Sequence, residues 1–189
     1  GDSHCLSPAW HTIKYRQKDH TLHPLLVTGM KIWHLGDEGV FCTKYNFYHS
    51  LQEAPRGSSI IFLFGEIDCR EGFILSIQKG RYKTLEEAAS FTIDIYEQRL
   101  RELVADFDYT ILIHPVPPVM DVTRSIVTTF NKLLKRRILD MAHPKIRFLD
   151  FFDGLLGSDG KISSEFDLDG THMHPKYLRL VQTALDNVF

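Results

Sequence analysis

The stretch Ser59-Ile60-Ile61-Phe62-Leu63-Phe64 is the clearest strand pattern in the chain. Its residues are almost all apolar, β-branched or aromatic, a Pro-Arg-Gly-Ser segment precedes them at 55–58, and Gly65 follows. A continuous apolar run bounded by turn residues is typical of a parallel strand that is covered on both faces. The sequence therefore predicts a buried central strand over residues 59–64.

Helix and strand patterns alternate on both sides of this stretch. Thr84 with Glu87 three residues later forms a capping box, and the apolar positions that follow keep helical spacing as far as Phe107. The other expected elements are strands over 25–27, 109–113 and 145–149 and helices that begin near Asp121 and at Pro175. Residues 6–16 stay unassigned. The alternation predicts an α/β fold, a three-layer sandwich with a central, mostly parallel sheet.

Composition predicts a single domain over residues 1–189. The chain is 43% apolar and 12% aromatic, enough for a full core. Its net charge of −2, from 22 basic and 24 acidic residues, gives no electrostatic reason to expect a nucleic-acid partner. No apolar run approaches the roughly 18 residues that a membrane span requires. A small or neutral partner is therefore expected.

Three cysteines, Cys5, Cys42 and Cys69, form an odd count without the spacing of a disulfide framework. Reduced thiols are the default for such a pattern. The chain also lacks an Asn-x-Ser/Thr glycosylation acceptor. Both observations favour a cytoplasmic location.

The chemistry-bearing motifs lie at opposite ends of the chain. Ser3 stands in the tight turn Gly1-Asp2-Ser3-His4, a suitable place for a nucleophile. A serine hydroxyl needs a positioned base and donors for the developing oxyanion. Near the other end, Asp169 precedes His172 by three residues, a spacing at which a carboxylate can orient an imidazole. These residues predict a nucleophile, Ser3, with His172 as its base and Asp169 as the residue that orients the base.

Gly-Asp-Ser at the start, Asp-Gly-Thr-His near the end and the strand-helix rhythm between them resemble the SGNH (GDSL-type) hydrolase family. The resemblance covers nearly the whole chain and implies a flavodoxin-like fold with a Ser-His-Asp triad and no cofactor. It implies an esterase that acts on an O-acyl ester, foremost O-acetyl, of a carbohydrate or another small substrate. Acyl transfer by the same residues is an open alternative.

The resemblance also implies a glycine whose backbone N–H helps to stabilise the oxyanion. Gly29, after the strand predicted over 25–27, is the favoured residue, and Gly39 is the rival because His34-x-Gly36-x-x-Gly39 has a spacing often seen in the family. Either glycine can instead do no more than permit a left-handed turn.

Another family block departs from its usual form. Gly-x-Asn-Asp is expected after the central strand, whereas this chain has Gly65-Glu66-Ile67-Asp68. Ile67 has no side-chain donor, and losing one oxyanion donor costs about 10²–10³ in rate. Arg70 can compensate or hold an anionic substrate group, and Asp68 is counted with it among the substrate-binding residues. The plainer alternative is an ion pair between Arg70 and Glu66 or Asp68.

Three further points stay open at this stage. The family's first strand precedes the Gly-Asp-Ser turn, so either part of the domain is missing from this sequence or the sheet is completed differently. A non-catalytic glycan-binding or scaffold domain with the same fold is one rival function. A metal-dependent phosphoesterase is another, for which the possible ligands are Asp2, His4, His34, Asp68, His172 and His174. If His4 is not a metal ligand, we expect it to make a loop contact in the site.

Overall fold

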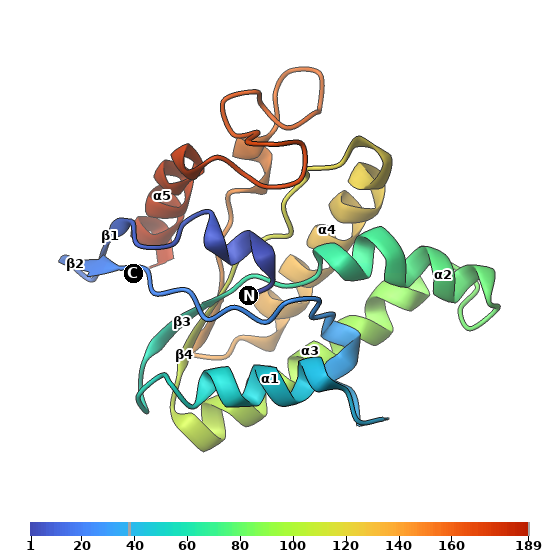
Figure 1. The fold of residues 1–189 in the computed structure, drawn as a ribbon, viewed down its shortest axis with the longest axis horizontal. Helices are drawn as coiled ribbons and strands as arrows, with labels where there is room; N and C mark the ends of the chain where they lie inside the picture. Colours follow the sequence, from blue (N-terminus) through green and yellow to red (C-terminus); the bar gives the residue numbers. More distant parts are fainter. Residues whose placement is uncertain (38, 189) are drawn as a thin grey trace.

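The computed structural model describes residues 1–37 and 39–188. Its central sheet has three parallel strands in the order β3 (Ser59–Phe62), β4 (Thr110–Ile113) and β5 (Ile146–Phe148) (Figure 1). Every residue of β4 is buried, as a middle strand covered on both faces requires. The three strands predicted over 59–64, 109–113 and 145–149 are confirmed, each with slightly shorter bounds.

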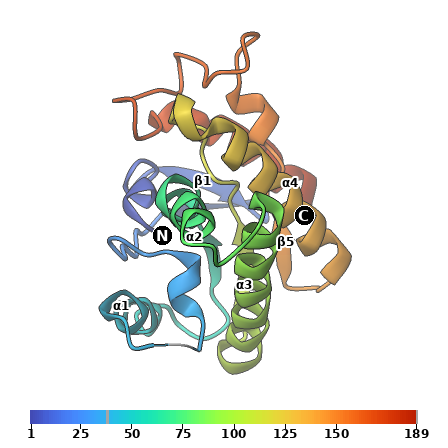
Figure 2. The same ribbon diagram turned by 90° about the vertical axis from the view of Figure 1, so that its right-hand side faces the viewer.

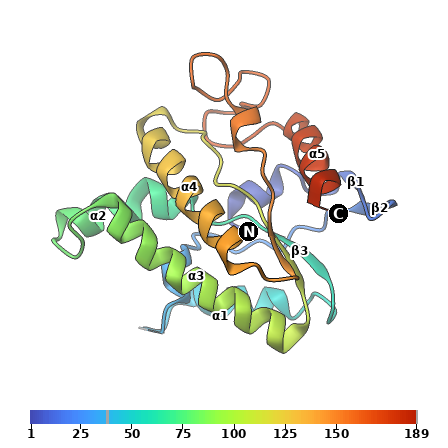
Figure 3. The same ribbon diagram turned by 180° about the vertical axis from the view of Figure 1, so that it is seen from behind.

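Two apolar clusters cover the two faces of the sheet. Ile111 and Ile113 of β4 belong to the larger cluster, and Leu112 belongs to the smaller one, because successive strand residues point to opposite faces. The larger cluster packs α1 (Cys42–Leu51), α2 (Phe73–Gln78), α3 (Leu85–Phe107) and α4 (Arg124–Met141). Figure 3 shows α3 and α4 lying across the sheet. The predicted three-layer α/β architecture is confirmed.

The smaller cluster lies on the opposite face. It joins α5 (Leu178–Val188) to the antiparallel hairpin of β1 (Thr12–Tyr15) and β2 (Lys18–Thr21), which forms a separate two-stranded sheet. The side-chain amide of Gln182 on α5 donates to the Lys14 carbonyl and accepts from the Lys14 amide, which fixes the hairpin on the helix. Figure 1 shows β1 and β2 beside α5, and Figure 2 shows α2 in front of β1.

The predicted helix starts are confirmed, with small differences. Thr84 caps α3 by accepting from the Glu87 amide at 3.2 Å, while the Glu87 carboxylate accepts from Lys83 rather than from Thr84. A 3-10 turn, Asp121–Thr123, precedes α4, and another, Pro175–Tyr177, precedes α5. Short 3-10 turns are common at helix N-termini, so each predicted start falls within three residues of the α-helix.

The strand predicted over residues 25–27 is wrong. This segment belongs to none of the described strands, and it is bonded to Gly1, whose amino group donates to the Leu25 carbonyl at 2.9 Å and whose carbonyl accepts from Val27 at 2.8 Å. The Asp2 amide donates to the Leu63 carbonyl at 3.3 Å, just beyond the last residue of β3. The start of the chain is thereby fixed between the 25–27 segment and the end of the central strand.

A cavity of about 720 Å³ lies beside the outer edge of β3. Its lining is contributed by β3, α1, α5 and the β1–β2 hairpin, with Gly1 and Cys5 at one end. That residues 1–189 form a single domain, with or without the strand that precedes the Gly-Asp-Ser turn in the family, stays a prediction. Within the described residues, none of the helices combines the length and apolar character that crossing a bilayer requires.

Candidate active site

Ser3 is held at the carboxyl edge of the parallel sheet, where open α/β folds bind their ligands. It is the first residue of a 3-10 turn, η1 (Ser3–Leu6). Asp2 caps this turn, because its Oδ1 atom accepts from the His4 amide at 3.0 Å. The bond from the Asp2 amide to Leu63 links the turn to the end of β3. The position of Ser3 therefore follows from the cap and from the central strand.

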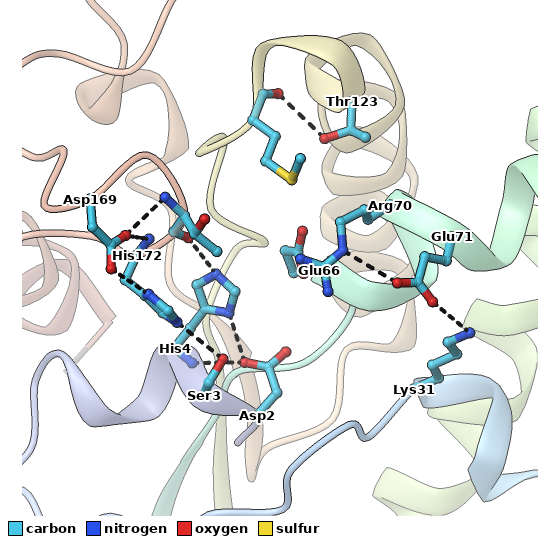
Figure 4. A network of polar contacts seen from close by, with 12 residues as sticks. Asp2, Ser3, His4, Lys31, Glu66, Arg70, Glu71, Thr123, Asp169 and His172 are labelled. Carbon is cyan, nitrogen blue, oxygen red and sulfur yellow. Dashed lines mark hydrogen bonds and ion pairs between the residues drawn. The ribbon is translucent and has the colours of Figure 1, made fainter.

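The loop near the other end of the chain brings Asp169 and His172 to Ser3. His172 Nε2 lies 3.2 Å from Ser3 Oγ, and His172 Nδ1 lies 2.9 Å from Asp169 Oδ2 (Figure 4). Asp169 Oδ1 accepts from the amides of Thr171 and His172. The hydrogen bonds from the His172 ring and from these two amides lower the pKa of Asp169 to about 2. The carboxylate is therefore ionised throughout the neutral range.

Two buried residues hold this loop against the smaller apolar cluster. Phe166 and Met173 flank Asp169 and His172 in the sequence, and each is only 1% exposed. The Leu168 amide donates to the His172 carbonyl at 3.0 Å, and a second backbone bond to Phe166 closes the loop behind it. His172 therefore lies on a short loop that is packed against the core, although its own side chain is part-exposed.

A second histidine–aspartate pair lies directly behind the first. His4 Nδ1 is 2.9 Å from Asp2 Oδ1, and His4 Nε2 is 2.9 Å from the Thr171 carbonyl oxygen. His4 is 2% exposed, and its ring centroid is 5.2 Å from that of His172. The sequence suggests a loop contact for His4 but not this pair, because Thr171 is 167 residues away in the chain.

The two glycines weighed as oxyanion donors occupy different places. Gly29 adopts φ +72° in the turn closed by the bond from the Met30 amide to the Val27 carbonyl, next to the segment that pairs with Gly1. Gly39 adopts φ +89°, and a Cβ atom built on it would lie 3.0 Å from the Phe41 ring. Both need the left-handed freedom of glycine. Gly29 lies two residues after Val27, whose amide donates to the Gly1 carbonyl at 2.8 Å, and its part in an oxyanion hole stays a prediction.

Asp68 is buried and bonded to the backbone of another loop. It is 1% exposed, and its two oxygens accept from the backbone amides of Ile32 at 2.8 Å and Trp33 at 3.2 Å. These bonds hold the start of the short turn η2 (Ile32–Leu35), and a role of Asp68 in substrate binding stays a prediction. Burial raises the pKa of Asp68 to about 6 in spite of those two bonds.

Arg70 forms the ion pair that the plainer interpretation predicts for it. Its Nη1 lies 3.6 Å from Glu66 Oε2, and its Nε lies 3.7 Å from Glu71 Oε1. Glu66 is 2% exposed, and neither of its carboxylate oxygens has a hydrogen-bond partner among the described residues. Figure 4 shows Glu66 and Arg70 on the opposite side of Asp2 and His4 from the Asp169–His172 pair.

The residues considered as metal ligands do not gather at one point. His34 Nδ1 accepts from the Lys31 amide at 3.1 Å, and His174 caps the turn before α5 through the Lys176 amide. In the part of the chain that the structure describes, no group of three or more His, Cys, Asp or Glu side chains is arranged to hold a metal ion.

The cysteines Cys5, Cys42 and Cys69 are free thiols. The cavity beside β3 includes neither Ser3 nor His172 in its lining.

Comparisons with known proteins support the architecture. No family model and no curated protein matches the chain. A solved structure from Streptococcus pneumonia, provisionally named a platelet activating factor, aligns with a TM-score of 0.67 and 15% identity over 100% of this chain and 81% of that one. The OSK domain of Drosophila Oskar aligns with a TM-score of 0.51 and 13% identity over 93% and 78% of the two chains. At these identities the likeness shows a shared fold.

Proposed function

We propose that the protein is a serine ester hydrolase in which Ser3 is the nucleophile, His172 the general base and Asp169 the residue that orients the base. The observation that carries this proposal is the continuous chain of contacts from Ser3 Oγ to His172 Nε2 at 3.2 Å and from His172 Nδ1 to Asp169 Oδ2 at 2.9 Å. A nucleophile, a base and an orienting carboxylate in this relation define the triad arrangement, irrespective of fold.

The contacts give each atom a role. Asp169 is a pure acceptor, so it holds the His172 proton on Nδ1 and leaves the Nε2 lone pair for the Ser3 hydroxyl. As Ser3 Oγ bonds to the ester carbonyl carbon, its proton moves to Nε2, and the imidazolium then protonates the departing alkoxide. Water, deprotonated by the same nitrogen, cleaves the acyl-serine and releases the acid. An alcohol in place of water would give acyl transfer.

Backbone amides are the proposed donors to the oxyanion. Ser3 begins a 3-10 turn, and the first amides of a helical turn lack intrahelical partners, so its N–H is free for this role. The Gly29 N–H is the second proposed donor, since the pairing of Val27 with Gly1 brings that turn to the same edge. Ile67 supplies no side-chain donor, which predicts slower chemistry than a site with a third donor.

The proposed substrate is an O-acyl ester, foremost O-acetyl, of a carbohydrate or another small molecule. His172 and Asp169 have side chains 32% and 51% exposed, so the reacting groups are open to a polar substrate from solvent. We place the activity in the cytoplasm, because three unpaired cysteines suit a reducing compartment.

A serine-directed fluorophosphonate tests the assignment. We expect covalent labelling of the parent and turnover of aryl acetates, both lost in Ser3→Ala. Ser158→Ala is the matched control, because Ser158 is an exposed loop serine and its replacement should leave labelling unchanged. Labelling of Ser3→Ala at the parental rate would show that the nucleophile is another residue.

A binding domain without turnover is the second candidate, and Ile67 is the observation that favours it. In that case glycan binding would survive Ser3→Ala while the parent would show no turnover of aryl acetates. Measurable turnover that Ser3→Ala abolishes would exclude it. The metal-dependent alternative predicts a stoichiometric metal by elemental analysis and loss of activity with chelator.

A further inference from the structure

His4 is a buried side chain with an acceptor opposite each ring nitrogen. The Asp2 carboxylate lies 2.9 Å from Nδ1, and the Thr171 carbonyl oxygen lies 2.9 Å from Nε2. Neither group can donate a proton. A neutral imidazole carries one N–H and one lone pair, so it can satisfy only one of these acceptors, whereas the imidazolium satisfies both. The geometry therefore selects the doubly protonated ring.

The groups around His4 support a positive charge at this position. Asp2 lies on the same turn, Glu66 follows β3, His114 follows β4, and His172 faces His4 from the base loop. Burial lowers the pKa of His4, but the hydrogen bond and charge of Asp2, together with Glu66 and the Thr171 carbonyl, outweigh it and leave that pKa raised. Burial lowers the pKa of His114 to about 4, so that ring is neutral and adds no competing charge.

The hydrogen bond between His4 and Thr171 joins residues that are next in the chain to the proposed nucleophile and to the proposed base. His4 follows Ser3 in the chain, and Thr171 precedes His172. The His4–Thr171 bond therefore joins the backbone neighbours of the nucleophile and of the base across 167 residues. A shift of this bond moves His172 relative to Ser3, and a misplacement of about 1 Å can cost on the order of 10²-fold in rate.

We propose, on the basis of the proposed esterase function, that His4 is a positioning residue whose imidazolium ties the Ser3 turn to the base loop through Asp2 and Thr171. It touches neither substrate nor reacting atoms. The contact forms while His4 is charged, so it is complete below the ordinary histidine pKa of 6.5 and is lost as pH rises through the raised pKa of His4. Neutral His4 keeps a single N–H and must give up either Asp2 or Thr171.

The charge state can be measured without any turnover. In a uniformly ¹⁵N-labelled Ser3→Ala protein, we expect both His4 ring nitrogens to show mainly the shifts of an imidazolium at pH 6.5, the ordinary pKa of a histidine. A neutral tautomer for His4 at that pH would overturn the proposal. Because this readout needs no active serine, it separates a failure of the positioning role from a failure of the esterase assignment.

The kinetic test uses Asp2→Asn, which keeps the size of the side chain and its acceptor for the His4 amide but removes the countercharge. We expect the His4 titration midpoint to fall by about one pH unit or more. The alkaline limb of kcat should move down by the same amount, with KM within about twofold of the parental value. A loss of folded protein alone would lower activity at every pH without moving that limb, and this outcome would overturn the positioning role.

His4→Gln provides a second, independent variant. Its amide can donate to Thr171 but cannot change charge with pH. We expect kcat to fall by about 10- to 100-fold and the alkaline limb caused by His4 to disappear. His11→Gln is the matched control, since that exposed histidine should leave the profile unaltered. An unchanged alkaline limb in His4→Gln would show that another group causes it.

Discussion

Arg70 and Glu66 form a pair of unequal burial beside the proposed site. The Glu66 side chain is 2% exposed and that of Arg70 is 31% exposed, and their nearest charged atoms are 3.6 Å apart. Burial raises the pKa of Glu66, and the charges of Arg70 and His4 oppose that effect. We therefore expect Arg70 to compensate a buried carboxylate rather than to donate to the oxyanion.

Arg70→Gln tests this role against a catalytic one. Removing the guanidinium leaves Glu66 uncompensated, and we expect a loss of about 1–2 kcal/mol in the free energy of unfolding, reduced by the partial exposure of Arg70. Adding Glu66→Gln should restore most of it, and kcat should change by less than about threefold. Urea unfolding and steady-state kinetics measure both. A parallel fall of about 100-fold in kcat and kcat/KM would instead identify Arg70 as an oxyanion donor.

Sequence reasoning located some site residues and missed others for a physical reason. Asp169 and His172 are close in the chain, so a single turn explains their contact and spacing can predict it. The bonds from Asp68 to the Ile32 and Trp33 amides span more than 30 residues, so spacing in the sequence cannot predict them. The contact between His4 and Thr171 likewise depends on tertiary structure. Local patterns carry no information on which distant backbone group will meet a buried side chain.

At the scale of elements, Asn131 on α4 connects that helix to the loop after β4. Its Oδ1 accepts from the Val116 amide at 2.8 Å, and its Nδ2 donates to the Val116 carbonyl at 2.9 Å. The loop reads His-Pro-Val-Pro-Pro over 114–118, and its three prolines lack amide donors. Regular backbone pairing is therefore impossible there. The side-chain amide of Asn131 has both a donor and an acceptor, so it pairs with the Val116 amide and carbonyl in place of a backbone partner.

Asn131→Leu should be costly although it keeps the number and branching of the side-chain heavy atoms. It leaves a buried amide and a buried carbonyl of Val116 without partners, each worth about 1–3 kcal/mol, so we expect a loss of about 2–4 kcal/mol in the free energy of unfolding. The matched control is Asn46→Leu on the exposed side of α1, which should change it by less than about 0.5 kcal/mol. Chemical denaturation compares the two. Similar losses would mean that the loop is held by other contacts.

The elements that the sequence predicted are those with strong local signals. The Thr84 cap and the periodic run behind it define α3, and the continuous apolar run defines β3. The β1–β2 hairpin was missed because only Ile13 and Tyr15 are buried in it and β2 is wholly exposed. The 25–27 run has the composition of a strand, but its backbone partner is the single residue Gly1. Pairing across the sheet, rather than propensity, decides such short segments.

At the scale of the whole molecule, the proposed nucleophile and base rest on different parts of the core. The Ser3 turn is bonded to the end of β3, whose Phe62 packs in the larger apolar cluster. The base loop is anchored by Phe166 and Met173 in the smaller cluster. The 3.2 Å contact between Ser3 and His172 therefore depends on how the two layers meet across the sheet. Two substitutions that lower the free energy of unfolding equally, one in each cluster, should therefore lower kcat by different amounts.

Phe166→Leu and Ile138→Val test this difference as a matched pair. Both side chains are nearly fully buried, Phe166 in the smaller cluster and Ile138 in the larger, and each change should cost about 0.5–2 kcal/mol of stability. After correction for the folded fraction, we expect kcat for an aryl acetate to fall by about tenfold in Phe166→Leu, because the space left under the loop lets His172 shift from Ser3. Ile138→Val should keep the parental kcat, because its cavity lies behind α4, away from the loop. Equal kcat values in the two variants would show that the base loop is held by its own hydrogen bonds and not by the layer beneath it. In that case the rigidity of the site would come from Asp169 and from the contact between His4 and Thr171, and His4→Gln would lower kcat more than any change in the smaller cluster.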